Sequence, residues 1–161
     1  MRGGALPAAL LCVAFALMLA FAPRRVVLPA ILLTAGAAVA GSFLPIGGPS
    51  IEIAFLACWA ILILACALIH LPGGVPTWLA LALAPMAGLA AGAVIAGEGA
   101  RTDLWRALPC LLLTLPARLI LARGWQIAIK VVSSWLVAVA LLAALLPQMA
   151  KTPGYVADHM D

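Results

Sequence analysis

Apolar residues along this chain occur in long continuous runs, not in the alternating pattern of membrane β-strands. Six runs are separated by short breaks that contain proline, glycine or charged residues. A run of about 18 or more apolar residues is long enough to cross the roughly 30 Å hydrocarbon core of a bilayer as a helix. The pattern predicts membrane helices over residues 5–22, 26–46, 51–71, 78–96, 103–122 and 126–147, followed by a polar C-terminal tail over 148–161.

These helices are expected to form a single all-α domain over residues 1–161, a polytopic membrane helix bundle. The breaks between runs are short, so consecutive helices are expected to run antiparallel. The fifth run is irregular because Pro109 and Pro116 each remove a backbone N–H donor and predict kinks. Arg118 also lies in this run, and we expect its long side chain to reach the membrane interface.

The first run has two interpretations. It follows Met-Arg and ends in Ala-Phe-Ala at residues 20–22, which is similar to a secretory signal with its small-residue cleavage site. Pro23 directly after that site and the length of the run favour a retained helix. The chain is therefore expected to have about six transmembrane helices, or five if the first is a cleaved signal.

Composition supports the membrane assignment. Hydrophobic residues make up 67% of the 161 residues and charged residues 9%, whereas a soluble domain carries roughly 25% charged residues. The expected partner is therefore the lipid bilayer. The net charge is +4, but the basic residues are scattered and do not indicate nucleic-acid binding.

Basic residues also bear on orientation, because Lys and Arg are enriched in cytoplasmic loops. Six spans place four basic residues on the side of both termini and five on the other side. The four are Arg2, Arg101, Arg106 and Lys151, and the five are Arg24, Arg25, Arg118, Arg123 and Lys130. This distribution favours an orientation with both termini outside.

Small residues recur every fourth position in the fourth run, at Ala84, Gly88, Gly92 and Ala96. Glycine costs about 1 kcal/mol relative to alanine in a helix interior, so its regular placement needs a compensating gain. In lipid that gain is close packing, because small residues let two helix backbones approach. The stripe predicts a packing seam within the bundle, and a dimer contact is the alternative.

The same stretch resembles a segment of the HupE/UreJ family of nickel-associated membrane proteins. Ala87-Gly88-Leu89-Ala90-Ala91-Gly92 is similar to the HG-x-x-HG pattern of that family, with both glycines matched and alanine at both histidine positions. Pro49, Glu52, Ile53 and Ala54 are similar to a second stretch, while the early histidine-rich motif of the family has no counterpart. The resemblance implies a permease-like protein of a bacterial inner membrane, active in transport or metal handling, whose usual metal ligands have been lost.

Cys66 and His70 are the remaining candidates for a metal site. They are four residues apart on the third predicted helix, so both face one side about 6 Å apart along the axis. Two ligands are too few, since about four are normal, and Cys12, Met86 or Cys110 would have to complete the site. The alternative is that His70 is a satisfied polar residue at a helix end. No cofactor is predicted.

Glu52 and His70 are candidates for a transport path. They share a helix face, but eighteen residues separate them by roughly 27 Å, so they would be the two mouths of a path and not one binding site. Alternatively, Glu52 is an ordinary carboxylate in a first helical turn, with Ser50 as the N-cap.

Catalytic residues are not predicted, because no serine or cysteine has an evident histidine–aspartate partner, and the chain is not expected to be an enzyme. The leading hypothesis is a membrane protein of the HupE/UreJ type in transport or metal handling. The alternative is a noncatalytic structural or accessory subunit of a larger membrane complex, which would contact other membrane subunits or form a homo-oligomer.

Overall fold

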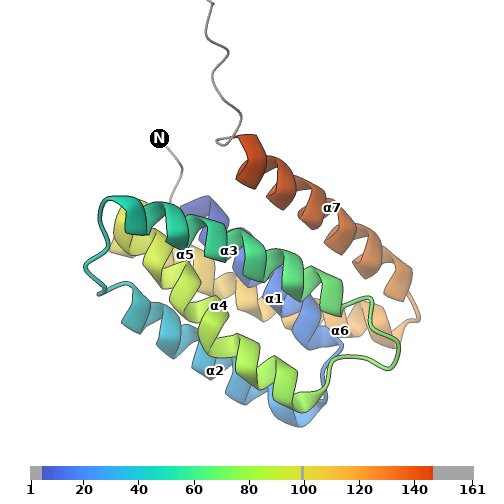
Figure 1. The fold of residues 1–161 in the computed structure, drawn as a ribbon. Helices are drawn as coiled ribbons and strands as arrows, with labels where there is room; N and C mark the ends of the chain where they lie inside the picture. Colours follow the sequence, from blue (N-terminus) through green and yellow to red (C-terminus); the bar gives the residue numbers. More distant parts are fainter. Residues whose placement is uncertain (1–4, 99, 147–161) are drawn as a thin grey trace, which may run out of the picture.

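Helices make up almost all of the described chain, residues 5–98 and 100–146 of a computed structural model (Figure 1). The long helices are α1 (Ala5–Ala20), α2 (Arg24–Gly41), α3 (Pro49–Leu68), α4 (Thr77–Glu98) and α7 (Gln126–Leu145). Between α4 and α7 runs a broken segment of η1 (Arg101–Asp103), α5 (Leu104–Ala107), η2 (Leu108–Leu113) and α6 (Thr114–Ala122). The predicted all-α fold class is confirmed, and the predicted tail over 148–161 lies outside the described residues.

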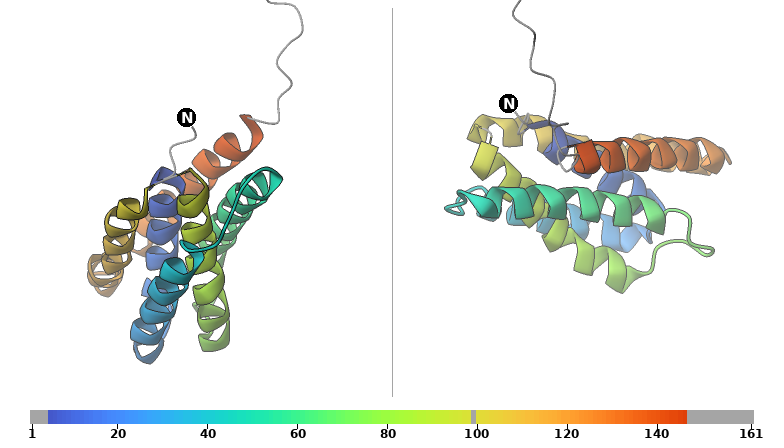
Figure 2. Two further views of the ribbon diagram at one scale, coloured as in Figure 1. Left: turned by 90° about the vertical axis from the view of Figure 1, so that its left-hand side faces the viewer. Right: turned by 45° about the horizontal axis from the view of Figure 1, so that its top comes forward.

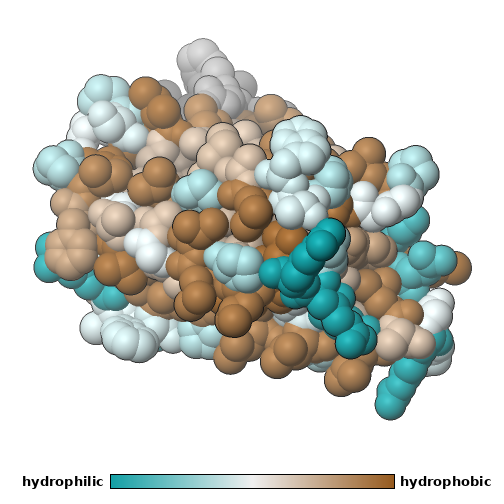
Figure 3. Space-filling model, turned by 90° about the horizontal axis from the view of Figure 1, so that it is seen from below, coloured by the Kyte–Doolittle hydropathy of each residue, from teal (hydrophilic) through white to brown (hydrophobic). Residues whose placement is uncertain are grey.

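Five helical segments of the described chain are long and apolar enough to cross a membrane: α2, α3, α4, Arg101–Ala122 and α7. The helix α1 is apolar but shorter. The face seen in Figure 3 fits a bilayer, because it is mostly hydrophobic, with strongly hydrophilic residues in only a few places. Large exposed side chains such as Leu28, Ile53 and Trp135 therefore contact lipid instead of water.

Several helix ends differ from the predicted ones because of proline and glycine. The second helix ends at Gly41 instead of 46, since Pro45 disfavours a helical conformation in the residue before it. The third helix begins at Pro49, directly after Gly48 with a φ of 57°, so Ser50 lies inside the first turn and is not the N-cap. The fifth run is divided as its prolines predict, with Pro109 in the 3₁₀ segment η2 and Pro116 in the first turn of α6.

The helix α1 lies in the middle of the bundle (Figure 2). It contacts α3, α4, α5, η2, α6 and α7. Its side chains Leu11, Phe15, Met18 and Leu19 have no exposed surface at all. The sequence favours a retained helix for this first run, with a cleaved signal as the alternative. In the structure its side chains lie at the centre of the core.

The helices α2 and α4 are in backbone contact along the small-residue stripe. A methyl group added at Gly88 would overlap the Thr34 carbonyl oxygen, and one added at Gly92 would overlap the Ala38 carbonyl oxygen. From the other side, a methyl group at Gly41 would lie 2.9 Å from the Leu89 carbonyl oxygen. These three positions admit only glycine at the observed separation of the two helices.

The two ends of the stripe differ in burial. Ala84 is fully buried, whereas Ala96 is half-buried near the end of α4. At its two glycines the stripe is in contact with α2 of the same chain.

Candidate functional site

His70 and Ser133 form a polar contact between α3 and α7. His70 follows the end of α3, and its Nε2 lies 3.3 Å from the Ser133 Oγ. The Ser133 hydroxyl also donates a hydrogen bond to the Lys130 carbonyl oxygen at 2.8 Å. Which of the two groups donates in the His70–Ser133 contact depends on the tautomer of the imidazole ring.

Cys66 and His70, the candidate metal pair, differ in their surroundings. Cys66 is fully buried in α3, whereas His70 is exposed. Of the proposed additional donors, Cys12 is buried in α1, Cys110 is half-buried and Met86 is exposed. Within residues 5–98 and 100–146, no three His, Cys, Asp or Glu side chains are placed to hold a metal ion.

Glu52 and His70, the candidate mouths of a path, lie at opposite ends of α3. Glu52 is in the first turn of the helix and is exposed. Between the two residues, α3 turns buried side chains such as Cys58, Leu62 and Ala65 toward the bundle. The fold therefore keeps the two residues apart, as their spacing in the sequence requires.

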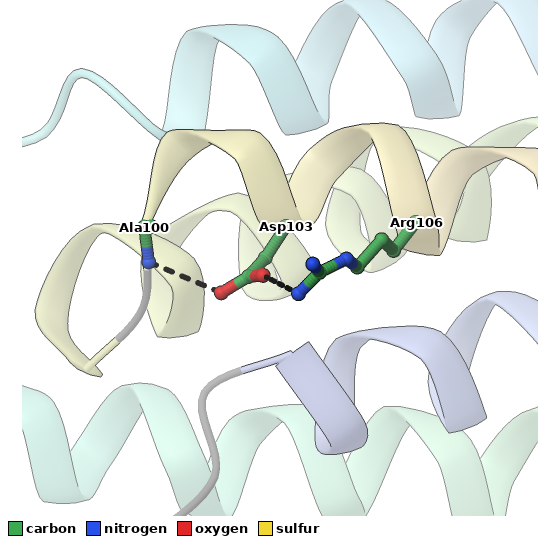
Figure 4. Close-up of polar contacts among 3 residues, drawn as sticks. All are labelled: Ala100, Asp103 and Arg106. Atoms are coloured by element: carbon green, nitrogen blue, oxygen red, sulfur yellow. Dashed lines mark hydrogen bonds and ion pairs between the residues drawn. The ribbon is translucent and has the colours of Figure 1, made fainter.

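Asp103 organises the polar turn between α4 and α5 (Figure 4). Its Oδ2 accepts a hydrogen bond from the Ala100 backbone N–H at 3.1 Å, and its Oδ1 accepts one from Arg106 Nη1 at 3.0 Å. The Arg101 guanidinium lies 4.7 Å from the centre of the Phe43 ring, which ties this turn to the end of α2. These contacts stabilise a turn and assemble no reactive group.

Arg118 holds the end of α1. Its Nη1 donates a hydrogen bond to the Ala22 carbonyl oxygen at 3.1 Å, across 96 positions of sequence. Nearby, the Phe21 carbonyl oxygen accepts a hydrogen bond from the Val75 backbone N–H at 3.3 Å. The carbonyl groups after the last turn of a helix have no partner within the helix, so these bonds satisfy two of them.

A groove lies between α2 and the segment η2–α6. Its volume is about 590 Å³, within the range of small-molecule sites. Arg24 and Arg118 line it together with apolar side chains that include Leu28, Ile31 and Leu115. The groove forms because α2 packs chiefly on α4, while η2 and α6 pack on α1.

Together, the five apolar spans and the lipid-facing surface define a polytopic helical membrane protein. Comparison with protein-family profiles, curated proteins and solved structures gives no match for this chain. The arginine-lined groove and the Arg118 contact were not anticipated as a site, because each joins residues that are distant in the sequence.

Replacing Arg118 by methionine is expected to lower the free energy of unfolding by about 2 kcal/mol, since hydrogen bonds to charged groups contribute roughly 1.5–3 kcal/mol. The methionine keeps most of the apolar length of the side chain but leaves the Ala22 carbonyl oxygen without its donor. Thermal unfolding of the purified chain in detergent measures the change. Arg123→Met, at the exposed end of α6, is the control, and an equal loss in both variants would contradict the assigned role.

Proposed function

We propose that this chain is a noncatalytic structural or accessory subunit of a larger membrane protein complex. The observation that carries the proposal is the packing of α1, whose aliphatic and aromatic side chains fill the centre of the bundle. A permeation path through the bundle would need that space for polar groups and water. A protein with a filled interior acts through its outer surface, which here is a set of lipid-facing helices.

The buried hydroxyl groups support this proposal. The hydroxyls of Thr34, Ser42 and Thr114 each donate to a carbonyl oxygen three or four residues earlier in the chain. Hydroxyl groups bonded in this way serve the local backbone, so they are not directed toward a transported ion or a substrate.

Purification of the tagged full chain in mild detergent, with copurifying proteins and bound metal measured on the same sample, tests the proposal. We expect another membrane protein at a fixed stoichiometry, and we expect its abundance in the membrane to fall when this chain is deleted. Isolation of the chain without a protein partner but with stoichiometric nickel or copper would overturn the proposal.

The second candidate is a HupE/UreJ-like role in transport or metal handling, in a bacterial inner membrane. The observation in its favour is the His70–Ser133 contact, which places a histidine at one end of α3, four residues after Cys66. Nickel accumulation by cells that express the chain tests it. Under this candidate, a Cys66→Ala, His70→Ala double variant loses accumulation, whereas Cys58→Ala, at another buried cysteine of α3, retains it.

A further inference from the structure

The groove between α2 and η2–α6 combines two charged side chains with apolar walls. Within the described part of the chain, Arg24 and Arg118 are the charged residues that line it. Leu28, Ile31, Leu112 and Leu115 contribute apolar side chains to the walls. A site of this kind suits a ligand that is itself divided into an anionic and an apolar part.

The two guanidinium groups have hydrogen-bonding capacity to spare. Arg118 uses Nη1 to hold the Ala22 carbonyl oxygen, and a guanidinium carries five N–H donors in total. Arg24 has no hydrogen-bond or ion-pair partner among the described residues. Two positive charges that line one groove repel each other, and an anion that binds both relieves this repulsion. Phosphate matches guanidinium groups well because two parallel N–H···O bonds form.

The charged residues of the groove lie beside the ends of apolar helices, which is where a membrane helix meets the lipid headgroups. Arg24 is the first residue of α2, and Arg118 reaches the carbonyl oxygen of Ala22, just beyond the end of α1. Both arginines belong to the membrane side on which the sequence places five basic residues, including Arg25, Arg123 and Lys130. Basic pockets between membrane helices at this depth are suited to anionic headgroups.

We propose that this groove is a binding site for one anionic phospholipid. The phosphate lies between Arg24 and Arg118, and an acyl chain follows the wall that Leu28, Ile31 and Leu115 form toward the membrane centre. This lipid fills the gap beside α2, which packs chiefly on α4, and it joins α2 to α6. The proposal concerns the outer surface and does not depend on the function proposed above.

Mass spectrometry of the intact full chain, released from detergent after titration with phosphatidylglycerol, tests the headgroup contact. Arg24→Gln is expected to weaken binding about fivefold, as the loss of roughly 1 kcal/mol per basic residue near an anionic membrane surface implies. Arg25→Gln is the matched control, because Arg25 is adjacent in sequence and exposed but does not line the groove. Equal weakening in both variants would overturn the proposal.

The acyl-chain contact has its own pair of variants. Leu28→Trp is expected to fill part of the groove and reduce phosphatidylglycerol binding, whereas Leu32→Trp is expected to leave it unchanged. Leu28 and Leu32 are 66% and 63% exposed on the same helix, but only Leu28 lines the groove. Equal binding by both tryptophan variants would overturn the proposal.

The unmodified chain provides the remaining comparison. We expect phosphatidylglycerol to bind more tightly than phosphatidylcholine of the same chain length, and inorganic phosphate not to displace it. Equal binding of the two lipids would show that the arginines do not select the headgroup. Displacement by inorganic phosphate would identify a free-anion site in place of a lipid site, and either result would overturn the proposal.

Discussion

Replacement of Gly92 by alanine is expected to force α2 away from α4 and to lower the free energy of unfolding by about 3 kcal/mol, near the upper end of the usual cost of overpacking. The added methyl group overlaps the Ala38 carbonyl oxygen and lies 2.8 Å from the Ser42 backbone nitrogen. Both are backbone atoms, one in the last turn of α2 and one in the residue that follows it, so no side-chain rotation relieves the overlap. Gly88→Ala is expected to behave similarly, because it meets the Thr34 carbonyl oxygen.

The matched control is Gly36→Ala, which changes the same residue type within α2. A methyl group at Gly36 has no atom of a neighbouring segment within 4 Å. This variant is expected to be as stable as the unmodified chain or up to about 1 kcal/mol more stable, because alanine is the better helix former. Reversible unfolding in mixed detergent micelles measures all three variants.

The outcome distinguishes the two interpretations of the stripe. Loss of stability in Gly92→Ala and Gly88→Ala that does not depend on protein concentration indicates a seam within one chain. A loss of stability that appears only when a dimer dissociates would mean that the glycines pack against a second chain and not against α2.

Truncation of Leu11 or Leu19 to alanine is expected to lower the free energy of unfolding by about 2 kcal/mol, below the roughly 2.7–5.0 kcal/mol of comparable soluble-protein changes. Both leucines are completely buried in α1, so each truncation leaves a cavity at the centre of the bundle. The expected loss of unfolding free energy is smaller than in a soluble protein, because a leucine of the unfolded chain stays in the apolar membrane. Most of the loss comes from the missing packing contacts.

Leu6→Ala is the control within the same helix, since Leu6 is 61% exposed. We expect this variant to change the unfolding midpoint little. Removal of the whole α1 segment is expected to prevent recovery of folded, monodisperse protein, because six neighbouring segments lose their common contact. Folded protein without α1, or equal effects of Leu6→Ala and Leu11→Ala, would contradict the central role of this helix.

Less of the candidate site than of the fold could be predicted from the sequence. The spacing of Cys66 and His70 indicates a shared helix face, but the end of α3 at Leu68 leaves one thiol buried and one imidazole exposed. The partner of His70 is Ser133, which lies on α7, 63 residues later in the chain. Helical periodicity carries no information on such a partner, because it describes one helix at a time.

The arginines illustrate the same difference. The sequence places Arg24 and Arg118 on one side of the membrane, since charges within an apolar chain are confined to the interfaces. Their common groove, and the bond from Arg118 to the end of α1, depend on which helices pack together. The anionic lipid that we propose for this groove is therefore an inference that only the packed structure supports.

The sequence by itself determined that the chain is an all-helical membrane protein and where most of its helices lie, because the length of an apolar run and the positions of proline and glycine act locally. Only the tertiary structure decided that the short first helix is central, that α2 packs on α4, and that a groove remains between α2 and η2–α6. Helices in lipid associate through shape and not through hydrophobicity, since the membrane is as apolar as their side chains. Shape complementarity is a property of pairs of surfaces, and a pattern along one chain does not specify it.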